Sequence, residues 1–134
     1  MASLEQVRRI ALEMPGSSER KSRGRAQWWV GERLFLWERP LRAGAIKRLR
    51  EAAPTGPILG ARVEHLGAKE ALLADAPEIF FTTSHFKGTA AILIRLDVIG
   101  PEDLQEAIVE AWLARAPARL AKAYVDANLP PRGD

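Results

Sequence analysis

The stretch "GRAQWWVGERLFLWERP", residues 24–40, decides the fold class, because it holds a dense run of strand-favouring side chains around a tight-turn signal. Aromatic and other bulky apolar residues, which favour strands, lie on both sides of Gly31-Glu32. Glycine takes the positive φ that a two-residue hairpin turn requires. We therefore expect a β-hairpin that turns at Gly31-Glu32.

Both faces of this hairpin are apolar. With a two-residue turn Trp28 faces Phe35 and Trp29 faces Leu34. We expect helices to cover one face and a loop or a second subunit to cover the other, so a homodimer through an apolar sheet face is one prediction. The alternative is an open face that binds a small ligand or a protein. The expected faces are Trp28, Val30, Phe35 and Trp37 on one side, and Trp29, Leu34 and Leu36 on the other.

Helical patterns flank the strand patterns. Ser3 and Gln6 form a capping-box pattern, and Pro15-Gly16 ends the helix that follows. Gly100-Pro101 starts a second long helix. The order predicts an α+β fold: an antiparallel sheet of about five strands with the N- and C-terminal helices packed on one face. The other expected elements are strands at 58–66, 78–81 and 89–99, short helices at 45–52 and 69–75, and a last helical segment from 117.

The length of 134 residues indicates one domain, residues 1–134, with a frayed tail at 128–134. No apolar run approaches the roughly 18 residues of a membrane span, and charges interrupt the N-terminus, so we expect a cytoplasmic protein that does not contact membranes. The absence of cysteine excludes disulfides and thiol catalysis. The expected core is Val7, Phe35, Ile92, Ile94, Leu104, Ile108 and Trp112.

Positive charge is concentrated in the first part of the chain. Residues 1–50 hold 12 Lys/Arg against 5 Asp/Glu, a net charge of +7, whereas the whole chain carries +3. Clustered cations of this kind contact nucleic-acid phosphates, with DNA as the expected partner. The alternative is a solvated basic surface. The candidate nucleic-acid-binding residues are Arg20, Lys21, Arg23 and Arg25 in one segment, and Lys47, Arg48 and Arg50 in the next.

The sequence gives little support to catalysis. It contains neither a nucleophile-elbow pattern nor a phosphate-binding glycine loop. His65 and His85 have nearby acids, but their spacing specifies no metal site. The acids Glu102, Asp103, Glu106 and Glu110 lie near one face of the expected helix, which is typical of a solvated surface. We therefore expect no catalytic residue, no metal and no cofactor.

His85 lies in "EIFFTTSHFKG", residues 78–88, between two apolar runs. We expect it where the chain turns between two strands, with its imidazole bonded to the backbone and Phe86 buried beneath the loop. The alternative is that His85, like Trp29, contacts a ligand on the open sheet face.

Four segments resemble the MmcQ/YjbR family of small bacterial proteins. They are "LEMPG" (12–16), the aromatic hairpin, "LGARV" (59–63) and "APEIFFTTSHFKG" (76–88), although "GTAAIL" (88–93) lacks the tryptophan usual there. The resemblance implies a frataxin-like arrangement of an antiparallel sheet against helices. The family's role is largely unassigned, and DNA binding has been proposed for it from fold similarity. A frataxin-like iron role would use an acidic first helix, whereas the helix around "QVRRIALEM" (6–14) has only Glu5 and Glu13 as acids.

Overall fold

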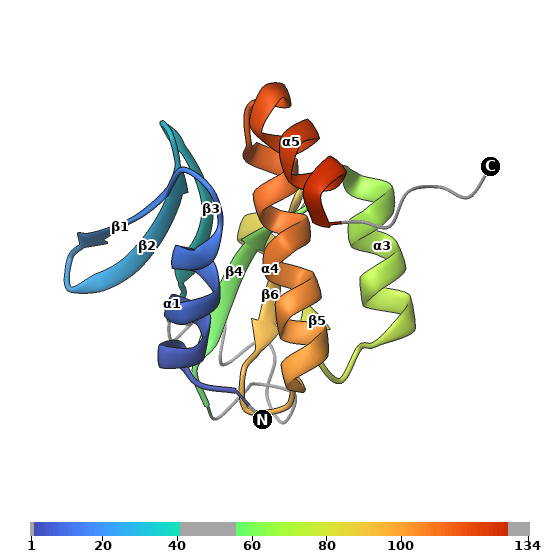
Figure 1. Cartoon of the computed structure of the whole chain (residues 1–134). Helices are drawn as coiled ribbons and strands as arrows, with labels where there is room; N and C mark the ends of the chain where they lie inside the picture. Colours follow the sequence, from blue (N-terminus) through green and yellow to red (C-terminus); the bar gives the residue numbers. More distant parts are fainter. Residues whose placement is uncertain (1, 41–55, 129–134) are drawn as a thin grey trace.

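A computed structural model describes residues 2–40 and 56–128. The chain has an α+β fold with a six-stranded sheet in the order β1-β2-β3-β4-β6-β5, and every neighbouring pair is antiparallel (Figure 1). The predicted class is confirmed, with one strand more than the expected five or so. The strands are β1 (Ser17–Ser22), β2 (Arg25–Val30), β3 (Arg33–Glu38), β4 (Ile58–Arg62), β5 (Phe80–Phe81) and β6 (Ala91–Arg95).

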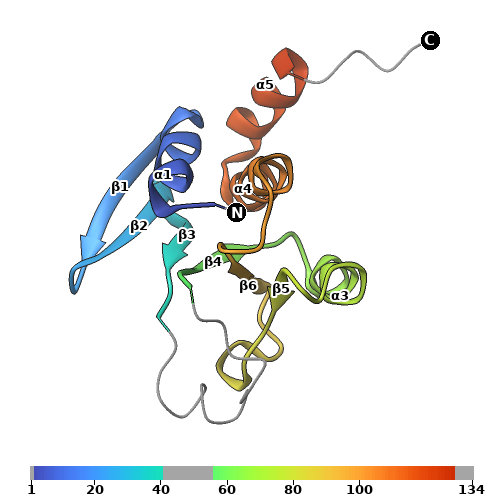
Figure 2. The same cartoon turned by 90° about the horizontal axis from the view of Figure 1, so that it is seen from below.

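The helices α1 and α4 lie on one face of the sheet, whereas the loop that follows β5 lies on the other face (Figure 2). The main core forms between the sheet and these helices, and all seven expected core residues are buried in it. A smaller apolar cluster occupies the second face, where Phe86 packs with residues of β4, β5 and β6. The helices are α1 (Leu4–Glu13), α3 (Leu66–Asp75), α4 (Pro101–Arg115), α5 (Ala118–Asn128) and the short 3-10 helix η2 (Ser84–Phe86).

Local signals set both long core helices as expected. Ser3 caps α1: its hydroxyl accepts from the Gln6 amide at 3.2 Å, and the Gln6 side chain accepts from the Ser3 amide at 2.9 Å. Pro101 occupies the first turn of α4. The indole of Trp112 on α4 donates to the carbonyl of Pro15 at 2.9 Å, so α4 is joined to the segment where α1 ends.

The strand β1 was not predicted, because residues 17–22 are polar and read as a basic loop. The structure pairs them with β2 through a two-residue turn at Arg23-Gly24, where φ is 54° and 77°. Positive φ at both positions is the geometry of a type I′ hairpin turn, which usually uses Asn-Gly. An edge strand with little burial needs few apolar side chains, so its sequence carries little strand signal.

The predicted pairing of Trp28 with Phe35 is wrong. Trp29 faces Leu34 as expected, but a β-bulge places Trp28 opposite Leu36 and leaves Phe35 as the extra residue. Phe35 and Leu36 are therefore both buried in the main core, and Trp37 packs instead against the cluster on the second face.

Other element boundaries also differ from expectation. The strand expected at 58–66 ends at Arg62, and α3 already begins at Leu66. His65 is the cause: its Nδ1 accepts from the Ala68 amide at 3.0 Å and caps the helix. The short helix expected at 45–52 lies outside the described residues.

Candidate functional site

The strands β1 and β2 form a two-stranded ribbon, residues 17–30, which extends beyond the rest of the sheet. Pairing of β2 with β3 stops at Gln27, opposite Trp37, whereas pairing of β2 with β1 continues to Arg25, opposite Ser22. Residues 20–26 therefore project as a ribbon with no third strand beside them, and both views show it directed away from α4 (Figures 1 and 2).

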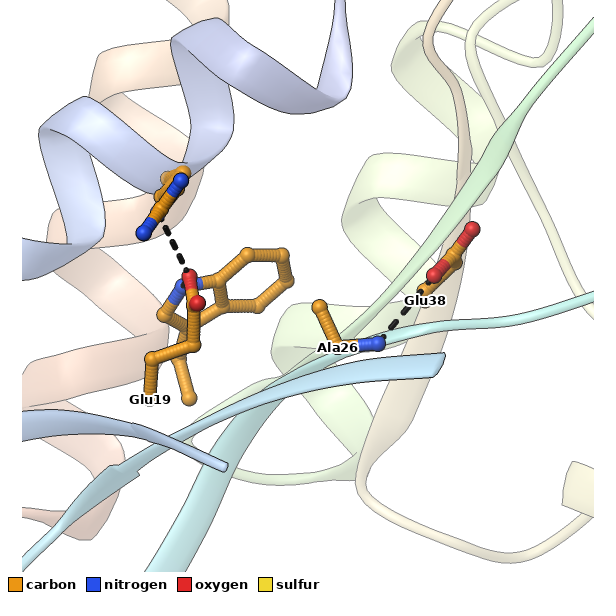
Figure 3. Close-up of polar contacts among 5 residues, drawn as sticks. Glu19, Ala26 and Glu38 are labelled. Carbon is orange, nitrogen blue, oxygen red and sulfur yellow. Dashed lines mark hydrogen bonds and ion pairs between the residues drawn. The ribbon is translucent and has the colours of Figure 1, made fainter. Parts of the chain in front are cut away.

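Glu19 fixes the base of the ribbon. Its carboxylate accepts from the Trp28 indole at 3.0 Å and lies 3.0 Å from Nε of Arg8 on α1, so one side chain joins β1 to β2 and to the helix above (Figure 3). On the opposite edge, the Glu38 carboxylate accepts from the Ala26 amide at 3.1 Å, at the point where β3 stops pairing (Figure 3). The Glu19 carboxylate therefore connects the ribbon to α1, and the Glu38 carboxylate connects it to β3.

The four cations predicted to bind nucleic acid all lie on the projecting part of this ribbon. Arg20 and Lys21 are in β1, Arg23 is in the turn and Arg25 begins β2, and all four are exposed. The ribbon contains a single acid, Glu19, and that acid is engaged at the base. The tip therefore carries positive charge that the ribbon itself does not neutralise.

Arg20 stacks on the tryptophan that was predicted to contact a ligand. Its guanidinium carbon lies 4.4 Å from the centre of the Trp29 ring, within cation–π distance. Arg20 also approaches the exposed Glu32 carboxylate at 3.9 Å. Because Arg20 covers one face of the indole, an aromatic ligand approaching that face would meet the guanidinium plane first.

The second basic segment, Lys47, Arg48 and Arg50, lies outside the described residues. Its proposed contact with phosphates stays a prediction, as does a homodimer through the second sheet face, where Trp29 and Leu34 are half-buried.

Trp29 and His85 do not form one site. Trp29 is on β2, whereas His85 is in η2, directly after β5, and three strands of the sheet lie between β2 and β5. His85 is exposed, and its ring contacts the Phe86 ring edge-on at 4.8 Å. Phe86 is buried as expected, but no hydrogen bond joins the His85 imidazole to another described residue.

Residues 2–40 and 56–128 contain no group of three or more His, Asp or Glu side chains that could hold a metal ion. Among the same residues, no helix has the length and apolar character needed to cross a membrane.

Comparison with known proteins gives relatives but no activity. The chain is 43% identical over 128 residues to the uncharacterised proteins Rv2570 of Mycobacterium tuberculosis and Mb2600 of Mycobacterium bovis, and the match covers 93% of this chain and 97% of each relative. No family model matches the chain. The crystal structure of the Deinococcus radiodurans protein DR2400, a DUF419 domain, aligns with a TM-score of 0.66 at 18% identity, over 100% of this chain and 94% of that chain. That likeness shows a shared fold.

Proposed function

The chain belongs to the family of the uncharacterised mycobacterial protein Rv2570, and from this premise we propose that it is a nucleic-acid-binding domain whose β1–β2 ribbon contacts phosphates. The family supplies no activity, so the geometry of the ribbon has to carry the proposal. The resemblance to the MmcQ/YjbR family stays a prediction beside it.

One observation carries the proposal: the ribbon projects four exposed cations from its tip while its single carboxylate is held at its base. Arg20 approaches the exposed Glu32 at 3.9 Å, whereas none of the ion pairs within the described residues includes the other three cations of the tip. A two-stranded ribbon also has the width that the major groove of B-DNA admits. The tip can therefore approach a duplex with its cations near both phosphate backbones.

The proposed contacts are mainly to phosphates, so binding should be weak, tolerant of sequence and sensitive to salt. Non-specific protein–DNA binding has dissociation constants of about 10⁻⁴ to 10⁻⁶ M at physiological salt. If the ribbon neutralises four phosphates, the logarithm of the binding constant should fall with the logarithm of the salt concentration with a slope of about −3 to −4. The Arg20–Trp29 stack adds a surface on which an unpaired base can lie.

The test is fluorescence anisotropy with a labelled duplex and a labelled single strand at several salt concentrations. The test variant combines Lys21→Gln, Arg23→Gln and Arg25→Gln, which removes three cations and leaves the Arg20–Trp29 stack in place. The matched control combines Lys87→Gln, Arg119→Gln and Lys122→Gln, which removes three exposed cations elsewhere.

We expect the ribbon variant to lose about two to three units of the salt slope on duplex DNA, because each lost phosphate contact removes about 0.9. The control variant should keep the wild-type slope to within about half a unit. Equal losses in the two variants would indicate that net charge alone drives binding. No binding by wild type at protein concentrations of about 100 μM and low salt would remove the proposal.

A further inference from the structure

A hollow of about 270 Å³ opens between α3, α4 and the sheet, at the end away from the β1–β2 ribbon. Its floor is formed by β4, β5 and β6, with Phe80, Ile92 and Ile94 among the side chains of the main core. Leu72 and Ala76 line it from α3. The lining is mostly apolar, so water inside it has few hydrogen-bond partners and is readily displaced by an apolar group.

The α4 side of the hollow is acidic. Asp103, Glu106 and Glu110 line it together with Ala107, because residues three, four and seven apart share one face of a helix. Within the described part of the chain, none of the three carboxylates lies in an ion pair. Among the described residues that line the hollow, Arg62 is the one basic residue, so this part of the lining carries excess negative charge.

All three acids are exposed at the rim of the hollow, and Glu110 has an electrostatic cost that a cation would relieve. Burial raises the pKa of Glu110 above its ordinary value, and the neighbouring carboxylates of Glu106 and Glu64 raise it further. A metal ion is not the natural occupant, since these acids belong to no metal-binding group among the described residues. An anion would add a like charge beside three carboxylates.

We propose that this hollow binds a small organic cation: an ammonium group on an apolar aromatic or branched aliphatic body. The apolar body lies against Leu72, Ile79 and Phe80, and the ammonium donates to the carboxylates of Glu106 and Glu110. An apolar cavity of about 150 Å³ holds benzene. A hollow of about 270 Å³ therefore accommodates a body of roughly this size together with a short aminoalkyl chain.

The experiment uses three probes of one shape and different charge: 2-phenylethylamine, 2-phenylethanol and 3-phenylpropionate. Each is titrated into the ¹⁵N-labelled full chain at pH 7, and amide shifts give both affinity and location. We expect the amine to bind with a dissociation constant in the millimolar range, which is usual for ligands of about ten non-hydrogen atoms. The alcohol should bind about three- to tenfold more weakly, and the carboxylate should not saturate.

Variants separate the charge from the hollow. The double variant Glu106→Gln with Glu110→Gln should weaken the amine about tenfold and leave the alcohol unchanged, because it alters charge and keeps shape. Glu102→Gln is the control, since Glu102 is an exposed acid of α4 outside the lining. Ala107→Leu and, separately, Leu72→Phe fill the hollow from opposite sides and should abolish shifts from both probes.

Three results would overturn the proposal. One is equal affinity for the amine and the alcohol, together with no effect of the double variant, which would show a purely apolar cleft. Another is amine-induced shifts that do not map to α3, α4 and the strands beneath them. The last is the absence of any saturable shift in wild type up to about 20 mM amine, which is weaker than a ligand of this size should bind to a formed site.

Discussion

The ammonium nitrogen of Lys69 lies 2.7 Å from the main-chain oxygen of Phe86. It also donates to the main-chain oxygen of Thr89 at 3.0 Å, and the lysine is only 5% exposed. A buried cation therefore joins α3 to the loop that holds η2. Sequence reasoning assigned the shaping of this loop to His85, yet the side chain that bonds the loop backbone belongs to a helix earlier in the chain.

We predict that Lys69→Met lowers the free energy of unfolding by about 2–4 kcal/mol. The thioether cannot replace the ammonium donor, so the carbonyl oxygens of Phe86 and Thr89 each lose a charge-assisted hydrogen bond and keep only a main-chain one. Urea denaturation followed by tryptophan fluorescence measures the effect. The exposed His85→Ala and Lys87→Met changes in the same loop should each stay within about 0.5 kcal/mol of wild type. A larger loss for His85→Ala than for Lys69→Met would return the loop-shaping role to the histidine.

Gly60 is required by the indole of Trp37. The two residues face each other across β3 and β4, and a Cβ atom at Gly60 would overlap the Trp37 ring. We expect Gly60→Ala to cost about 1–3 kcal/mol, because the ring must move out of a packed position. The same change made in a Trp37→Leu background should cost less than about 1 kcal/mol. Equal costs in the two backgrounds would show that strand propensity, and not the overlap, sets the penalty.

The features of this fold that depend on residues close together in the sequence could be predicted, whereas those that depend on distant contacts could not. The capping box at Ser3 and the buried stripe of α4, which includes Leu104 and Ile108, depend on residues within two helical turns, so the sequence shows them directly. The bulge at Phe35 is different. The sequence allows two registers of the hairpin that would bury similar numbers of apolar side chains. Packing of Phe35 and Leu36 in the main core favours the observed one.

The candidate sites too could be predicted from the sequence only in part. The cluster of cations at Lys21, Arg23 and Arg25 can be recognised in the sequence. Their position on a projecting ribbon depends on β1, whose polar residues and Arg-Gly turn are weak indicators of a strand. The hollow beside α4 could not be predicted. Its acids are exposed, as the prediction of a solvated helix face requires, and the apolar floor beside them depends on the placement of α3.

Glu110 should make stability depend on pH. Its pKa is raised in the folded state, chiefly by burial, so the folded protein binds this proton more tightly than the unfolded chain. Stability from this group is therefore fully present below the unfolded pKa and falls as pH rises through the folded pKa. We expect Glu110→Gln to become more stable relative to wild type as pH increases across that window. Urea midpoints of this variant and of wild type, measured from pH 4 to pH 7, should therefore diverge as the pH rises.

Glu19 joins the ribbon to α1 through its contact with Arg8. Glu19→Leu removes the acceptor of the half-exposed Arg8 and of the Trp28 indole, and it leaves the indole donor unpaired in a buried position. The expected loss is about 1–3 kcal/mol. Glu19→Gln keeps an oxygen for the indole and loses only the charge, so it should cost less than about 1 kcal/mol, since exposed ion pairs contribute little. Thermal or urea denaturation compares the two.

The same pair of variants bears on the proposed function. Glu19→Gln removes the negative charge of the ribbon's single acid but keeps an oxygen for the Trp28 indole, so the lower end of the ribbon stays fixed. Duplex affinity at low salt should therefore stay equal to wild type or rise, by up to about fivefold. Glu19→Leu removes the same charge but loosens the anchor that orients the tip, so its affinity should fall below that of Glu19→Gln. Anisotropy on the duplex used for the ribbon variants measures both. Identical affinities for the two variants would mean that charge alone acts and that the fixed direction of the ribbon contributes nothing to binding.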